Sequence, residues 1–206
     1  AGSVSDDYVH VCSELDRYEA VRAFEINISC PNVKEGGITF GTSPKSASSL
    51  VEAVRASTKK PLIVKLSPNV TDISVIATAA EQSGADAVSL INTITGIVID
   101  VETRRPMLAN VTGGLSGPAI RPVAVRMVYQ VARAVSIPVI GMGGIFCARD
   151  ALEFIIAGAS LVEVGCGMFV KPRLPLMVID GINEYLVKHD FRCVTDLVGS
   201  LSAAEE

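Results

Sequence analysis

The stretch Glu25-Ile-Asn-Ile-Ser-Cys-Pro-Asn-Val33 organises the chain, because a short apolar strand runs directly into polar side chains there. Pro31 cannot donate to a strand ladder and restricts the residue before it to extended geometry, so we expect the strand to end beside Cys30. The amides of Asn27 and Asn32 flank this thiol. The stretch predicts either a reactive cysteine at the mouth of a strand or a small cysteine that only packs.

The order of strand, polar loop and helix then repeats along the chain. Short, continuous apolar runs predict strands of the kind that a parallel sheet buries on both faces. We expect them at residues 23–28, 62–66, 87–91, 138–142 and 161–164. Apolar periodicity predicts an opening helix capped by Ser5-Asp6-Asp7 and later helices at residues 46–57, 72–83, 118–135, 148–157 and 175–188. A long polar excursion is expected between the third strand and residue 118.

The repeat places the chain in the α/β class, where a doubly wound sheet and a barrel are the two candidate arrangements. No G-x-G-x-x-G motif of the doubly wound, dinucleotide-binding kind follows the first strand. Polar or glycine-bearing loops follow all of the strands, which is typical of a TIM (β/α)8 barrel, and such a barrel needs eight strands and about 250 residues. We therefore predict one barrel domain over residues 1–206 that is incomplete, with about five of the eight βα units present and the N-terminal ones lacking.

Composition favours small-molecule chemistry. With 206 residues and 49% hydrophobic content, the chain can bury one sizeable core. The net charge of -4 comes from interspersed acids and bases, so no basic surface for nucleic acid or anionic lipid is indicated. No apolar run reaches the roughly 20 residues of a membrane span, and the first residues do not resemble a signal peptide. We expect a soluble, cytoplasmic protein.

The cysteine and carboxylate patterns argue against a metal centre. The 5 cysteines are widely spaced and form no C-x-x-C pair, so neither a disulfide framework nor a zinc or iron–sulfur site is predicted in this chain. Cys12, Cys147 and Cys193 are expected to pack. Carboxylates are scarce near the strand ends and no H-E-x-x-H motif occurs, which disfavours metal hydrolysis and glycosidase chemistry.

Two other strand ends carry polar side chains. Lys65 lies at the end of an apolar strand, and because burying an unpaired ammonium is costly, it should face an anion or an electron-rich ring. The alternative is a lysine on an exposed sheet edge that extends into water. Asn92 and Thr93 end the third strand, and their side chains could recognise a planar ring by hydrogen bonds to its carbonyl and N–H groups. Asn92 could equally be an ordinary turn residue.

Three glycine-rich turns occur in the later units. They are Gly113-Gly-Leu-Ser-Gly117, Gly143-Gly144 and Gly165-Cys-Gly167. Each alone could simply reverse the chain. Clustered backbone N–H groups hold phosphate without cationic side chains, and barrels commonly bind phosphate after their last strands. Together the turns predict a phosphate site.

These motifs in combination resemble the dihydroorotate dehydrogenase family. The matching segments are Asn27-Ile-Ser-Cys-Pro-Asn32, Val64-Lys-Leu-Ser-Pro68, Ile91-Asn-Thr93, Gly113-Gly-Leu-Ser-Gly-Pro118, Ile140-Gly-Met-Gly-Gly-Ile145 and Val164-Gly165. They look like the class 1 catalytic subunit, and Val33-Lys-Glu-Gly-Gly37 with Ser67-Pro-Asn69 is closest to the NAD-linked 1B branch. The resemblance covers essentially the whole chain and begins partway into the family's barrel, so it implies an N-terminally truncated member.

The resemblance implies a flavoenzyme of de novo pyrimidine biosynthesis that oxidises dihydroorotate to orotate with FMN. Cys30 would be the catalytic base that removes a proton beside the ring carbonyl, while hydride leaves the adjacent carbon for FMN. A thiol with a free pKa of about 8.5 can act as a base once its surroundings favour the thiolate. The membrane-linked class has serine at this position.

The resemblance also assigns the remaining site residues. Substrate would be bound by Asn27, Asn32, Asn92 and Thr93. Lys65 would lie by the pyrimidine edge of the flavin, which Asn27 also contacts. The backbone that holds FMN, chiefly its phosphate, would be that of Ile91, Gly117, Gly143, Gly144, Gly165 and Cys166. Cys166 is a departure, because the family usually has threonine there and a thiol is a weaker hydrogen-bond donor.

By the same resemblance, FAD and a 2Fe-2S cluster would belong to a separate electron-transfer subunit, and the full-length protein would be a homodimer or part of a heterotetramer. Two alternatives stay open. One is a related dihydropyrimidine-type FMN oxidoreductase that acts on uracil-type rings. The other is a non-catalytic partial barrel whose open sheet edges pair with other chains.

Overall fold

A parallel five-stranded sheet forms the centre of the molecule. The structure is a computed structural model that describes residues 2–29 and 40–202. The strand order is β1-β2-β3-β8-β9, which follows the chain. The strands are β1 (Phe24–Asn27), β2 (Leu62–Lys65), β3 (Ala87–Leu90), β8 (Val139–Met142) and β9 (Leu161–Glu163). All five predicted strands are confirmed, with ends that differ by at most one residue.

The predicted helices are also present. They are α1 (Ser5–Asp16), α2 (Pro44–Ser57), α3 (Ile73–Gln82), α4 (Arg121–Ala132), α5 (Ala148–Ala157) and α7 (Leu174–Lys188). The helix predicted over residues 118–135 is divided, because the 3-10 turn η2 (Pro118–Ile120) precedes α4. A short helix, α6 (Gly167–Val170), was not predicted.

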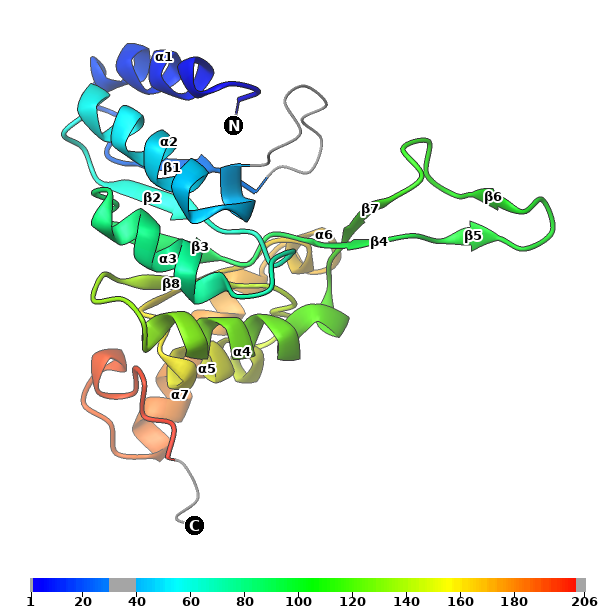
Figure 1. Cartoon of the computed structure of the whole chain (residues 1–206). Helices are drawn as coiled ribbons and strands as arrows, with labels where there is room; N and C mark the ends of the chain where they lie inside the picture. The colour runs from blue at the N-terminus through cyan, green and yellow to red at the C-terminus, as the bar shows by residue number, and fades with distance from the viewer. Residues whose placement is uncertain (1, 30–39, 203–206) are drawn as a thin grey trace.

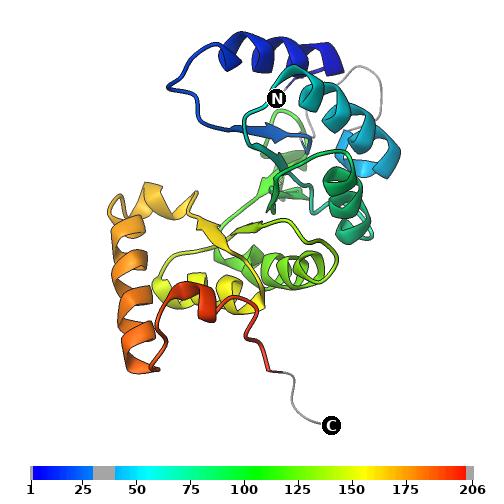
Figure 2. The same ribbon diagram turned by 90° about the vertical axis from the view of Figure 1, so that its left-hand side faces the viewer.

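The helices lie on one side of the sheet. Successive helices contact one another in a row that runs α1, α2, α3, α4, α5 and α7. Viewed along the sheet, α2 to α7 form an arc around the outside of the strands (Figure 2). A doubly wound sheet would place helices on both faces. The arrangement therefore belongs to the barrel type, with β1 and β9 as the edges of the described sheet.

The two faces of the sheet differ in polarity. On the face toward the helices, Ile26, Val64 and Val88 lie side by side and are at most 3% exposed. On the opposite face, Asn27 pairs with Lys65 across the sheet. Successive side chains of a strand point to opposite faces, so one strand contributes both to the apolar core and to a polar interior.

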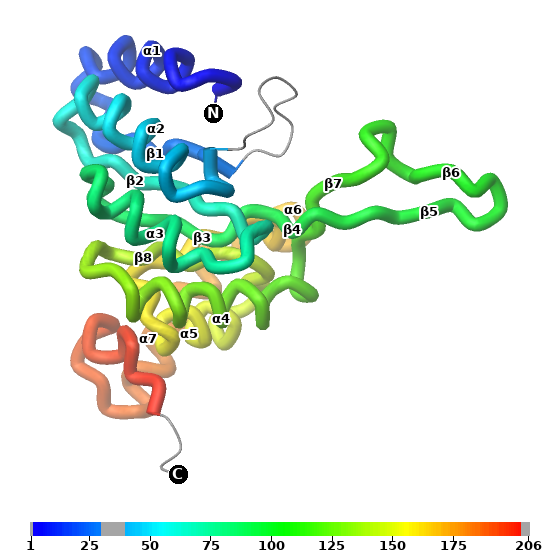
Figure 3. Tube along the Cα trace, viewed as in Figure 1, coloured from blue at the N-terminus to red at the C-terminus, as the bar shows by residue number. Residues whose placement is uncertain are grey.

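An antiparallel arm projects from the body after β3 (Figures 1 and 3). It contains β4 (Ile94–Gly96) paired with β7 (Gly113–Leu115), and β5 (Ile99–Asp100) paired with β6 (Arg105–Pro106). The expectation of a polar excursion is wrong, because several apolar side chains of the arm are more than half exposed: Ile97, Val98, Ile99, Val101, Met107 and Val111. Apolar residues in alternating short strands form a ribbon here without being buried.

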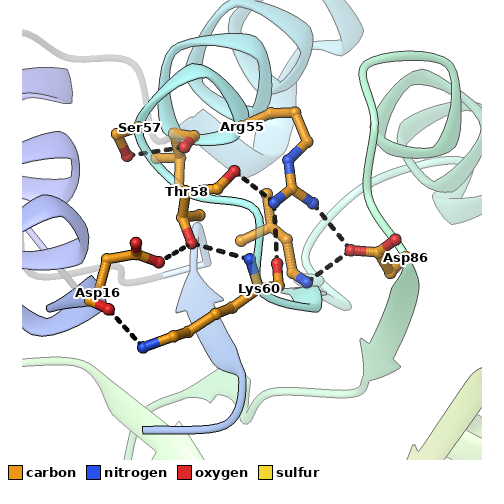
Figure 4. Close-up of polar contacts among 8 residues, drawn as sticks. Asp16, Arg55, Ser57, Thr58, Lys60 and Asp86 are labelled. Carbon is orange, nitrogen blue, oxygen red and sulfur yellow. Dashed lines mark hydrogen bonds and ion pairs between the residues drawn. The ribbon is translucent and has the colours of Figure 1, made fainter. Parts of the chain in front are cut away.

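A polar network ties α1, α2 and the amino ends of β2 and β3 together (Figure 4). The Arg55 guanidinium pairs with Asp86 at 2.8 Å and donates to the carbonyl oxygens of Thr58 (2.6 Å) and Lys60 (2.8 Å). The Thr58 hydroxyl donates to the Asp16 carboxylate, and the Lys60 ammonium donates to the Asp16 carbonyl at 2.6 Å. The end of a barrel at which the strands begin generally contributes to stability rather than to catalysis.

The cysteine prediction is partly wrong. Cys12 is buried in the core, whereas Cys147 and Cys193 are exposed. Both exposed thiols directly precede a helical segment, α5 and the 3-10 turn η3 (Val194–Asp196) respectively, where the chain turns at the surface. None of the described helices is long and apolar enough to cross a membrane.

Candidate functional site

A cavity of about 310 Å³ opens at the carboxyl ends of β2, β3, β8 and β9. Its volume is near the lower end of the roughly 300–1,000 Å³ of small-molecule pockets. Eight predicted site residues line it: Lys65, Ile91, Asn92, Thr93, Gly143, Gly144, Gly165 and Cys166. We call it the strand-end cavity. Parallel strands end at one edge of the sheet, which is why residues far apart in the sequence meet there.

A hydrogen-bonded group of two amides and a hydroxyl lies beside this cavity. Asn27 is not among the lining residues, but its Oδ1 accepts from Asn92 Nδ2 at 3.3 Å. Ser29 joins the two amides, because its hydroxyl donates to Asn27 Oδ1 at 2.6 Å and accepts from Asn92 Nδ2 at 2.6 Å. Ser29 is buried and was not predicted as a site residue, since a serine in an extended segment carries no distinctive signal.

Asn69 fixes the rim of the cavity. Its Nδ2 donates to the carbonyl oxygen of Thr93 at 3.1 Å, and its Oδ1 accepts from the amide of Thr95 at 2.9 Å. Asn92 Oδ1 accepts from the Thr93 amide at 2.8 Å. The base of the arm is therefore held against the loop after β2, with Asn92 and Thr93 at the cavity wall.

Lys65 lies inside the sheet and not at its edge. β2 pairs with β1 on one side and β3 on the other, so the alternative of an exposed edge lysine is wrong. Lys65 is half-buried, and its neighbours in register are Asn27 and Ser89. Within the described residues, its ammonium forms neither a hydrogen bond nor an ion pair.

The glycine turns approach one another closely. Gly144 has a φ of +81°, and a Cβ there would lie 2.7 Å from the carbonyl oxygen of Gly117. Gly117 itself is not a lining residue, although its neighbours Ser116 and Ile120 are. A Cβ on Gly117 or on Gly165 would meet no atom within 4 Å. The backbone at these two positions therefore faces open space.

A partly buried ion pair lies next to the Gly143-Gly144 turn. Arg121, the first residue of α4, pairs with Asp150 of α5. The other carboxylate oxygen of Asp150 accepts from the amides of Phe146 (2.8 Å) and Cys147 (3.1 Å). Arg121 Cβ would lie 3.0 Å from a Cβ on Gly144. Sequence reasoning missed this pair, because its members lie on separate helices and match no motif.

Glu163 at the end of β9 also lines the cavity and was not predicted. It is half-buried. Burial raises the pKa of its carboxyl above the usual 4.5; the charge of Glu25 adds to this rise and that of Lys65 opposes it. A strand-end glutamate could have been noticed in the sequence, where the prediction considered only paired carboxylates.

Cys30 and Asn32 lie outside the described residues, so their predicted roles stay predictions. The described chain leads up to them through Ser29, whose hydroxyl is bonded to both Asn27 and Asn92. Among residues 2–29 and 40–202, no group of three His, Cys, Asp or Glu side chains could hold a metal ion.

A family model described as dihydroorotate dehydrogenase matches residues 1–186. The chain belongs to the dihydroorotate dehydrogenase family. This confirms the family that the motifs indicated. Proteins named dihydroorotate dehydrogenase B (NAD(+)), catalytic subunit, are 58% identical over 200 residues in Trichlorobacter lovleyi and 55% identical over 201 residues in Bacteroides thetaiotaomicron.

These two relatives match 97% and 98% of this chain, and the resemblance to the NAD-linked branch is thereby confirmed. The chain spans 66% of the length of each relative. A crystal structure of DHODH from Eimeria tenella in complex with ferulenol has a TM-score of 0.79 and 26% identity, and covers 95% of this chain and 57% of that one. The fold is that of a TIM barrel, of which residues 2–29 and 40–202 form five βα units.

Proposed function

We propose that this member of the dihydroorotate dehydrogenase family oxidises dihydroorotate to orotate in pyrimidine biosynthesis, with FMN as the bound electron acceptor. The observation that carries the proposal is the strand-end cavity, which brings Lys65, the amide group around Asn27 and the glycine turns to one edge of the sheet. The family match and the printed names of the curated relatives support the same reaction.

The residues around the cavity fit a flavin with a phosphate tail. The backbone at Gly117 and Gly165 faces open space, as a phosphate cradle requires, and Lys65, which has no partner among the described residues, offers a positive charge. The residues proposed to hold FMN are Asn27, Lys65, Ile91, Gly117, Gly143, Gly144, Gly165 and Cys166. When bound, FMN accepts the electron pair and the hydrogen that leave the substrate ring.

The amide group is oriented for substrate recognition. Both Nδ2 hydrogens of Asn92 are directed to Ser29 and Asn27, and its Oδ1 accepts from Thr93. Asn27 Oδ1 accepts from Asn92 and Ser29, while no described residue accepts a hydrogen bond from its Nδ2. We propose that Asn27 donates to a ring carbonyl, with Asn32, Asn92 and Thr93 completing the contacts to the substrate.

Cys30 is proposed to take the proton from the carbon beside the ring carbonyl. Replacing Cys30 by alanine should leave FMN bound but slow flavin reduction by dihydroorotate at least about a hundredfold, because a positioned general base contributes that much or more. Anaerobic stopped-flow absorbance measures this rate. Reduction by dithionite is the control, and an unchanged rate with dihydroorotate would remove Cys30 from this role.

The substrate is tested by comparing two rings. The purified full-length protein should be yellow, and its flavin should bleach without oxygen when dihydroorotate is added but not when dihydrouracil is added. Bleaching by dihydrouracil alone would favour the dihydropyrimidine-type reaction instead. If the protein binds no added FMN, both the dihydroorotate and the dihydropyrimidine-type reaction are ruled out.

The name "catalytic subunit" of the relatives supports a separate electron-transfer subunit. We propose that this partner carries FAD and a 2Fe-2S cluster, and that the full-length protein is a homodimer or part of a heterotetramer in the cytoplasm. The single FMN-binding barrel domain over residues 1–206 is part of the same proposal. Size-exclusion chromatography distinguishes it from a non-catalytic partial barrel, which would elute as mixed, flavin-free aggregates.

A further inference from the structure

The interior face of the described sheet carries three charged side chains, two of which line the strand-end cavity. Lys65 and Glu163 line the cavity from β2 and β9. Glu25 is on β1 and shares the interior face with Asn27, because the two residues are two positions apart on one strand. Lys65 is thus the one cation, and Glu25 and Glu163 are the two carboxylates, on a face of the described sheet that is otherwise apolar or uncharged.

Glu25 is held next to Lys65 by a hydrogen bond that crosses β2. Its carboxylate accepts from the hydroxyl of Ser89, which lies on β3. Ser89 is fully buried and is the register partner of Lys65. The side chain of Glu25 therefore reaches over the intervening strand, which carries Lys65 on the same face.

Glu163 approaches the same lysine from the other wall of the cavity. Both side chains line the cavity, and no ion pair within 4 Å joins them in the described residues. The pKa of Glu163 is raised by its burial and by the charge of Glu25, and lowered by the charge of Lys65, so both neighbours act on this carboxyl. The thiol of Cys166 is the remaining titratable group on that wall.

We propose that Glu163 acts on the bound flavin by offsetting part of the positive charge that Lys65 places in the cavity. This inference rests on the proposed function, since Lys65 is the residue proposed to lie at the edge of FMN. A negative charge near a flavin disfavours its reduced form, which carries more negative charge. Glu163 therefore lowers the reduction potential of the bound flavin relative to Lys65 alone.

The first test measures the midpoint potential of bound FMN in the full-length protein. Glu163→Gln should raise the potential, shifting the ratio of reduced to oxidised flavin by about tenfold, which is about 30 mV for a two-electron couple. In a Lys65→Met background the same substitution should raise the potential less, because loss of Lys65 raises the pKa of Glu163 and leaves less of the carboxyl ionised. Glu184→Gln on the exposed surface of α7 is the matched control and should leave the potential unchanged.

An unchanged potential in Glu163→Gln overturns the proposal. An equal rise with and without Lys65 also overturns it, because the charge of Glu163 would then not depend on Lys65. A merely structural role predicts loss of protein stability without any change in potential.

The second test needs no flavin. Carbon-13 NMR follows the titration of the Glu163 carboxyl in the flavin-free protein. Lys65→Met should raise the pKa of Glu163, because a stabilising positive charge is lost, and Glu25→Gln should lower it. A pKa that neither substitution moves overturns the proposal. If FMN fails to bind while both shifts occur, the proposed function fails and the coupling between these residues stands.

Discussion

At the scale of single residues, two glycines of the cavity are expected to behave differently when a methyl group is added. Gly144→Ala forces a side chain onto a φ of +81°, with its Cβ 2.7 Å from a backbone oxygen, so we expect a loss of about 1–3 kcal/mol in unfolding free energy. Gly165→Ala enters open space and should change stability by less than about 0.5 kcal/mol.

Urea denaturation of the two variants measures this difference. Equal destabilisation by both substitutions would show that the open space at Gly165 is not present in the folded protein.

The stability of the protein should depend on the charge of Glu163. Its pKa is raised in the folded state, so the ionised carboxylate costs free energy above that pKa, and the cost disappears as the pH falls to 4.5 and below. Glu163→Gln should therefore unfold at higher urea concentration than the wild type at neutral pH. The difference should shrink on acidification.

A difference between Glu163→Gln and wild type that grows as the pH falls would contradict this assignment. Urea midpoints measured from neutral to acidic pH, with Glu184→Gln as the exposed control, provide the comparison.

The sequence predicted most residues that the structure brings to the cavity, because strand ends, glycine turns and amides are visible as local patterns. Lys65 and Asn92 are examples. Ser29, Glu163 and Arg121 were missed, because their importance depends on partners that are distant in the chain. The assignment of Cys30 as the catalytic base rests on the family resemblance alone.

At the scale of secondary structure elements, the network at the amino ends of β2 and β3 should matter more than a surface ion pair. Arg55→Ala removes an ion pair and two hydrogen bonds to backbone carbonyls, and we expect it to cost about 1–3 kcal/mol in unfolding free energy. The matched control is Arg17→Ala, whose exposed pair with Glu14 should contribute less than about 1 kcal/mol.

Urea denaturation of both arginine variants decides the point. A loss in Arg17→Ala as large as that in Arg55→Ala would show that the network in Figure 4 is not a specific source of stability.

The arm should open independently of the barrel. Its outer pair, β5 and β6, contacts little besides itself, whereas β3 and β8 are buried between neighbouring strands and helices. Amide hydrogens of the outer pair should exchange much faster than those of β3 and β8 in native-state hydrogen exchange. Equal protection of arm and sheet would indicate that the arm is covered by another part of the molecule or by a second chain.

Elements with a strong apolar pattern were predicted well from the sequence, including α5, whose bounds are as expected. The arm was not, because its strands are only two or three residues long and cannot show a clear period. The split of the predicted helix at residue 118 was also missed, since Pro118 is compatible with both a 3-10 turn and the first turn of an α-helix.

At the scale of the whole molecule, the described sheet is an arc with β1 and β9 as its edges. The cavity lies between β2 and β9, so the four strand ends that line it all belong to this chain. Its lining residues include Lys65 and residues of all three glycine turns. We therefore expect FMN to bind to the part of the barrel present here.

The most direct measurement of this central claim is an equilibrium titration of the protein with FMN, followed by the quenching of flavin fluorescence. We predict saturable binding of one FMN per chain, weakened about tenfold or more by Gly165→Ala, a loss of about 1.4 kcal/mol in binding free energy, and unchanged by Glu184→Gln. Absence of saturable binding, or equal affinity in the wild type and Gly165→Ala, would contradict the claim that this cavity is the flavin site.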